Sequence, residues 1–108
     1  MKQKRNIARS SGNVFADLGI SNPEQYLAKA ELAATILRIV ERRRLTQAAT
    51  GKLLGISQPK VSALLNGRLD GFSSDRLFRF LNALGCDVRI VVSPPHTGST
   101  GCIRVKAG

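Results

Sequence analysis

The side chains best suited to specific recognition fall close together, at the start and along one side of a predicted short helix that begins near position 57. Because Val61 and Leu64 at helical spacing belong to a core, the other side of this helix faces outward. The outward residues are Ser57, Gln58, Pro59, Ser62, Ala63 and Asn66. The Gln58 amide donates and accepts side by side, as adenine N6 and N7 require, Ser62 can contact several bases, and the Ala63 methyl can meet a thymine methyl. Together with Pro59, these residues are the predicted base contacts in a DNA major groove.

A second set of groups is suited to binding phosphate. Backbone N–H groups at helix starts are natural phosphate ligands, and Gln47 and Ser57 stand at two such starts. Lys60 lies nearer the flank of the outward face and is a predicted phosphate contact. Arg68, just after the end of the same predicted helix, is another. Arg42 and Arg43 belong to the basic run Arg42, Arg43 and Arg44 at the end of the first predicted helix, for which a favourable interaction with the helix dipole is an equally good explanation.

Catalytic chemistry has little support in the sequence. The single histidine, His96, lies in a Pro/Gly/Ser loop without a partner at useful spacing, and the seven acidic residues are scattered. Cys86 and Cys102 lack the CxxC spacing or the companion histidines of a zinc site, and a disulfide scaffold is equally unsupported. We therefore expect neither an enzyme nor a bound metal, cofactor or small-molecule substrate.

The charge balance favours a polyanionic partner. Seventeen Lys and Arg against seven Asp and Glu give a net charge of +10 over 108 residues. A membrane surface is the weaker interpretation, because tryptophan is absent and the longest apolar runs are far too short to span a bilayer. The basic N-terminus is not followed by a continuous apolar segment of a signal peptide, so we expect a cytoplasmic protein.

Start and stop signals divide the chain into four predicted helices. In the first, Pro23 is the first helical residue and Asn22 the cap, with Ser21 and Glu24 as an alternative capping box. This helix runs to about position 43, and its predicted apolar stripe is Tyr26, Ala30, Ala33, Leu37 and Val40. The others span 47–54 with Thr46 as cap, 57–66 with Ser57 as cap, and the segment from Ser73 or Ser74 to 84. The second and third helices would cross around a turn at Gly55, with their separation set by four apolar residues: Leu54, Ile56, Val61 and Leu64.

The C-terminal part of the chain changes character. Residues 86–92 are β-branched and partly alternating, which predicts a strand. A single strand needs another edge, supplied either by residues 102–105 of the same chain or, as we favour, by the same strand of a second subunit. The predicted organisation is a flexible basic arm over 1–12, which either follows phosphates or only solubilises the chain, a domain over 13–93, and a flexible tail over 94–108.

The stretch LTQAATGKLLGISQPKVSALLNGRLDGFS, residues 45–73, resembles the helix-turn-helix of Cro/C1-type (XRE) repressors. The resemblance covers about residues 30–85. It implies a mainly α, compact, four- to five-helix lambda-repressor-like domain, here with a short C-terminal β-strand, that binds a double-stranded DNA operator as a homodimer. It also implies that Gln47 contacts phosphate, that Gln58 and Ser62 face bases, and that Asn66 anchors the backbone after the third helix.

Two further features refine this expectation. The segments VFADLG and NPEQYLAKAEL resemble a HigA-like antitoxin subgroup, whose members repress their own operon and bind a small ribonuclease toxin, so a cognate toxin is a possible partner. Thr50 and Gly51 depart from the family pattern of a large apolar residue followed by alanine. Glycine in a helix costs about 1 kcal/mol relative to alanine. Gly51 therefore indicates either a closer crossing of the two helices or a less stable domain.

Overall fold

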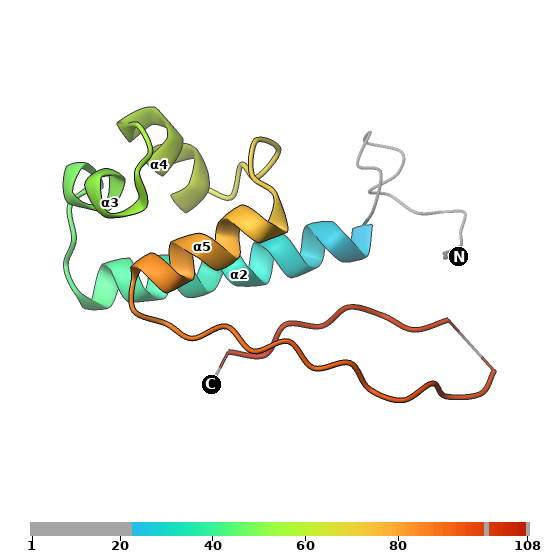
Figure 1. Ribbon diagram of the computed structural model, residues 1–108. Coiled ribbons are helices and arrows are strands. Elements are labelled where there is room, and N and C mark those ends of the chain that lie inside the picture. The colour runs from blue at the N-terminus through green and yellow to red at the C-terminus, as the bar shows by residue number, and fades with distance from the viewer. Residues whose placement is uncertain (1–22, 99, 108) are drawn as a thin grey trace.

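The computed structural model describes residues 23–98 and 100–107, and within them the chain is mainly helical. Its four helices are α2 (Pro23–Arg42), α3 (Gln47–Leu54), α4 (Gln58–Leu65) and α5 (Ser74–Ala83). Figure 1 shows α2 and α5 lying beside each other, α3 and α4 on one side of this pair, and the extended C-terminal residues on the other. The predicted fold of a helical domain is thus confirmed, with four helices in the described part of the chain.

Helix α2 begins and ends close to the predicted positions. It starts at Pro23, whereas the predicted cap Asn22 lies outside the described residues. It ends at Arg42, and the chain then reverses through Arg44, whose φ of 55° places it in the left-handed region. The amide of Leu45 donates to the carbonyl of Val40 at 3.0 Å, which satisfies one of the last carbonyls of the helix.

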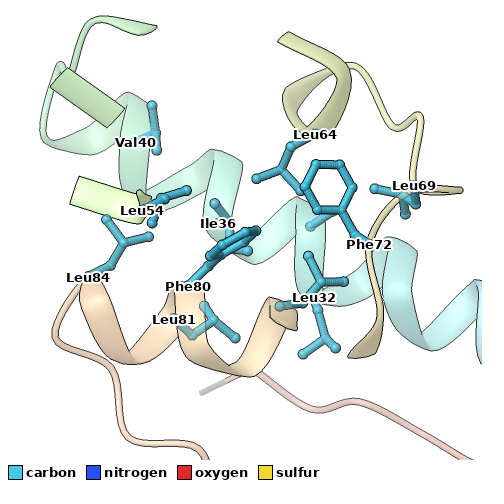
Figure 2. Packing of buried hydrophobic residues seen from close by; sticks show 12 residues of the cluster. Leu32, Ile36, Val40, Leu54, Leu64, Leu69, Phe72, Phe80, Leu81 and Leu84 are labelled. Carbon is cyan, nitrogen blue, oxygen red and sulfur yellow. The ribbon is translucent and has the colours of Figure 1, made fainter. Parts of the chain in front are cut away.

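The buried face of α2 is rotated from the predicted stripe. Ala33 and Val40 are buried as expected, but the centre of the face is Ile36, which is fully buried, with Leu32 beside it. Figure 2 shows Ile36 at the centre of the core cluster, facing side chains from the other helices. The predicted stripe followed the spacing of Tyr26 and Leu37, both of which are only half-buried. An aliphatic helix with apolar residues on several sides allows more than one stripe, and packing against α5 selects one of them.

The core joins all four helices and the loop before α5. It contains Leu32, Ala33, Ile36 and Val40 of α2, Leu54 of α3, Leu64 of α4, Leu69 and Phe72 of the loop, and Leu77, Phe80, Leu81 and Leu84 at α5. Phe72 and Phe80 meet edge to face, with ring centroids 5.9 Å apart. This arrangement of aromatic rings is favourable beyond the area it buries, and it holds the loop after α4 against α5.

The predicted strand over 86–92 is not formed. Within the described residues no segment is a strand, and residues 86–96 have no regular secondary structure, followed by a turn at 97–98. The reason is that residues 87–92 have no backbone hydrogen bond to another described segment, and an isolated strand is not stable. The alternative pairing with 102–105 is not formed either, because the amide of Ile103 donates instead to the Glu24 carboxylate at 3.1 Å. In the described part of the chain, no helix is long and apolar enough to cross a membrane.

Candidate nucleic-acid interface

The turn between α3 and α4 fixes how these two helices cross. Gly55 adopts φ 73° and ψ 34°, and both its amide and that of Ile56 donate to the Gly51 carbonyl, at 2.8 and 3.0 Å. A side chain is disfavoured at this backbone conformation, so glycine is the suitable residue at position 55. The sequence-based placement of the turn at Gly55 is therefore confirmed.

Gly51 lies where the turn folds back against α3. A Cβ atom at this position would stand 2.7 Å from the carbonyl oxygen of Ile56 and 3.4 Å from Cγ2 of Val61. The first distance is far inside van der Waals contact and involves backbone, which cannot rotate out of the way. Of the two explanations left open by the sequence, the structure favours close approach as the reason for glycine here.

Thr50, the other departure from the family pattern, is fully buried. Its hydroxyl donates to the carbonyl of Thr46 at 2.8 Å, so the buried polar atom has a hydrogen-bond partner. The Thr46 hydroxyl in turn accepts from the amide of Ala49 at 3.0 Å and caps α3, as predicted. The two threonines thus stabilise the first turns of α3, and Thr50 still fills core volume.

The outward side of α4 carries most of the predicted base contacts. Gln58 and Pro59 are exposed at its first turn, behind the Ser57 hydroxyl, which accepts from the amide of Lys60 at 3.4 Å. Ser62 is half-exposed one turn later, and Ala63 is half-buried where it packs against the core. The structure therefore brings Gln58, Pro59 and Ser62 to one accessible face, and Ala63 lies at its edge.

Asn66 is linked to Ser62 rather than standing alone. Its Nδ2 donates to the Ser62 carbonyl at 2.8 Å and to the Ser62 hydroxyl at 3.3 Å. This contact closes the last turn of α4 and orients the hydroxyl that is predicted to face bases. Asn66 thus has a structural role at the helix end in addition to its predicted contact with the DNA backbone.

A shallow depression connects the starts of α3 and α4. It is lined by Gln47, Ala48, Gly51, Lys52, Gly55, Ile56 and Gln58. The first amides of α3 have no helical carbonyl partner, and Lys52, in the last turn of the same helix, adds a positive charge to the lining. The depression therefore combines polar side chains, a helix start and a cation, which are features that favour binding of a phosphate oxygen.

Lys60 is directed toward the loop before α5. Its Nζ lies 5.5 Å from the centroid of the Phe72 ring, and the Arg76 guanidinium carbon lies 5.8 Å from the same centroid. Cation–π attraction holds both charges at one ring. Lys60 in the first turn of α4 and Arg76 of α5 thus place their cations together at the loop before α5.

The remaining predicted phosphate contacts differ in their surroundings. Arg42 and Arg68 are exposed. The Arg43 guanidinium instead donates to the carbonyl of Leu84, which lies just after α5. This bond joins the C-terminal ends of α2 and α5, and it gives the Arg43 side chain a structural partner that the sequence did not indicate.

Comparisons with known proteins agree with this arrangement. A family model described as a helix-turn-helix domain matches residues 14–93. The chain belongs to this family. A solved structure named as an XRE family transcriptional regulator is 45% identical, with a TM-score of 0.73 over 79% of this chain and 97% of that one. The comparison with curated proteins gives no match.

Sequence reasoning overlooked two cationic side chains on or beside this helix-turn-helix unit. Lys52 shares the face of α3 that carries Gln47, Ala48 and Gly51, and counting one helical turn from Ala48 would have found it. Arg76 had no such signal, because it lies on α5, and its contact with Phe72 depends on how the loop before α5 folds. Only the tertiary structure places it beside Lys60.

Proposed function

We propose that this chain is a DNA-binding transcriptional regulator of the XRE type, and that it inserts α4 into the major groove. Membership of the helix-turn-helix family and the related XRE regulator support the proposal. The observation that carries it is that α4 starts with exposed Gln58 and Pro59 directly beside the depression at the start of α3. A groove-bound α4 can then read base edges while α3 contacts the adjacent phosphates.

The charges around α4 fit this docking. Lys52 lies on one side of the helix start, and Lys60 with Arg76 lies toward the loop before α5. Cations at two flanks can contact phosphates on both sides of a groove. Such contacts supply affinity without sequence information, whereas Gln58 and Ser62 supply the base readout.

The test begins with selection of bound sequences from a random DNA pool by the full chain. Gln58→Ala should then weaken binding to the selected sequence by about 1–3 kcal/mol and leave binding to random DNA unchanged, because only base contacts distinguish sequences. Gln25→Ala, an exposed glutamine on the first turn of α2, is the matched control and should bind both DNAs like the wild type. Equal losses on both DNAs for Gln58→Ala would refute the role of Gln58 in base readout.

We further propose that the regulator is a repressor and acts as a homodimer. A symmetric dimer would protect two half-sites about one helical turn, roughly 34–36 Å, apart. Footprinting on the selected sequence distinguishes this arrangement from a single protected half-site. A promoter placed over that sequence should lose activity when the protein is expressed, and increased activity would contradict the repressor role.

Toxin neutralisation is the alternative function, and it depends on the HigA-like resemblance. Part of that resemblance, VFADLG, lies outside the described residues. The check is co-purification of the chain with the product of any adjacent reading frame for a small basic protein. A solitary gene would count against this role without affecting the DNA-binding proposal.

A further inference from the structure

Three polar residues form one row along the outward side of α4 and its C-terminal cap. Gln58, Ser62 and Asn66 are four residues apart, so their side chains lie one above another on the helix. Gln58 and Asn66 are exposed, and Ser62 between them is half-exposed. Asn66 Nδ2 lies 2.8 Å from the Ser62 carbonyl oxygen and 3.3 Å from Ser62 Oγ. A predicted base contact therefore has a hydrogen-bonded neighbour in the same row.

The backbone fixes the direction of this hydrogen bond. A carbonyl oxygen only accepts, so the Asn66 atom next to the Ser62 carbonyl is the amide nitrogen and not the amide oxygen. The second hydrogen of the same nitrogen faces the Ser62 hydroxyl, whose oxygen therefore accepts. The hydrogen of that hydroxyl must then point away from Asn66.

Ser62 differs in this respect from two other hydroxyls inside helices. Thr35 and Thr50 each donate to the carbonyl four residues earlier, at 2.9 and 2.8 Å, which is the usual partner of a hydroxyl within a helix. Ser62 makes no such bond, and within the described part of the chain its side chain is hydrogen-bonded to Asn66 alone. The Ser62 hydroxyl hydrogen is thus available to a ligand.

The end of α4 does not need this side-chain bond. The Ser62 carbonyl also accepts from the backbone amide of Asn66, at 3.0 Å. Removing the Asn66 side chain would therefore leave this carbonyl with a partner. What the side chain alone supplies is the contact with the Ser62 hydroxyl.

We propose that Asn66 is a positioning residue for base readout: by donating to Ser62 Oγ, it presents the Ser62 hydroxyl as a hydrogen-bond donor to a base edge. A hydroxyl that already accepts a hydrogen bond is also the stronger donor. In the major groove guanine, adenine and thymine offer an acceptor, whereas cytosine offers its N4 amino group, a donor. Ser62 should therefore select a base with an acceptor and reject cytosine. The inference rests on the proposed insertion of α4 and deepens it by naming the kind of base edge that Ser62 reads.

The test uses the full chain and the DNA sequence selected from a random pool. Ser62→Ala identifies the base position that Ser62 reads, as the position where preference is lost. Asn66→Ala should reduce the preference for the acceptor base over cytosine at this same position by about two- to tenfold, the contribution of one hydrogen bond. The double variant should lose no more than Ser62→Ala alone, because Asn66 acts through Ser62. In Asn66→Asp the carboxylate takes the Ser62 hydroxyl hydrogen, so the preference should vanish or move to a base with an amino group.

A preference is a ratio within one variant, so a contact of Asn66 with the DNA backbone cancels from it. Asn82→Ala is the matched control, because Asn82 is an exposed asparagine in the last turn of α5 whose Nδ2 also donates to a carbonyl, that of Cys86 at 2.9 Å. This control should keep every base preference of the wild type. An unchanged preference in Asn66→Ala or Asn66→Asp, or an additive loss in the double variant, would overturn the inference.

A measurement without DNA separates this inference from the proposed function. Three-bond NMR coupling constants should show a single Ser62 side-chain rotamer in the wild type and a different or averaged one in Asn66→Ala. Averaged rotamers in the wild type would overturn the positioning role of Asn66 and leave the proposed function standing if a sequence is selected. A random pool that yields no enriched sequence would instead refute the proposed function, and the base readout by Ser62 with it.

Discussion

Replacing Gly51 with alanine tests the close approach between α3 and the turn that follows it. The added Cβ would lie 2.7 Å from the Ile56 carbonyl oxygen, and a relaxed carbon–oxygen contact needs more than half an ångström beyond that. The nearest atom belongs to the backbone of the turn, and the next, Val61 Cγ2 at 3.4 Å, belongs to a fully buried side chain. Neither side of the contact can yield without moving α4 relative to α3.

Two effects of opposite sign set the magnitude. Alanine gains about 1 kcal/mol over glycine from helix propensity. Overpacking at a buried position costs about 1–3 kcal/mol, and the upper half of this range applies because backbone must shift. The free energy of unfolding should therefore fall by about 1–2 kcal/mol, which lowers Tm by about 4–8 °C for each kcal/mol in a domain of this size.

The assay is thermal unfolding followed by far-UV circular dichroism. Ala48→Gly is the matched control, because Ala48 is exposed on the same helix and reports helix propensity without a steric contact. It should lower the stability by up to about 1 kcal/mol. If Gly51→Ala melts at the wild-type temperature or above, the close approach does not constrain position 51, and the reasoning is refuted.

Three other substitutions separate cations with a structural role from cations that contact DNA. Arg43→Met removes the hydrogen bond to the Leu84 carbonyl, so unfolding measurements should show a loss of about 1 kcal/mol. The dependence of DNA affinity on salt should stay as in the wild type, and a shallower dependence would show that Arg43 reaches phosphate instead. Arg76→Gln and Lys60→Gln should each reduce the slope of log affinity against log salt concentration by about 1, if the cations held at Phe72 contact phosphate. Unchanged slopes in titrations on random DNA would remove both residues from the interface.

The helix boundaries could be predicted because local chemistry determines them. Pro23, Thr46 and Ser57 mark helix starts through backbone restriction or side-chain caps, and α3 spans the predicted residues 47–54. Gly55 could be placed at the turn for the same reason, since the left-handed conformation favours glycine wherever the neighbouring residues demand it. These features depend on residues only a few positions apart.

The predicted strand failed because its stability is not a local property. Residues 86–92 have the composition of a strand, yet hydrogen bonding requires a second edge that the described chain does not provide. The rotated face of α2 has a related cause. Which of several apolar positions becomes the centre of the core depends on the helix packed against it, and Ile36 rather than Leu37 meets that surface.

The sequence by itself determined the helical class, the helix-turn-helix unit and the exposed position of Gln58, because periodicity, caps and the turn glycine act over short separations. Only the tertiary structure decided how the cations around this unit are placed. It holds Arg76 with Lys60 at the Phe72 ring and attaches Arg43 to the end of α5. It also showed that Gly51 is set by contact with the Ile56 carbonyl. Those relations depend on how separate helices pack against one another, and no residue spacing within a single helix specifies them.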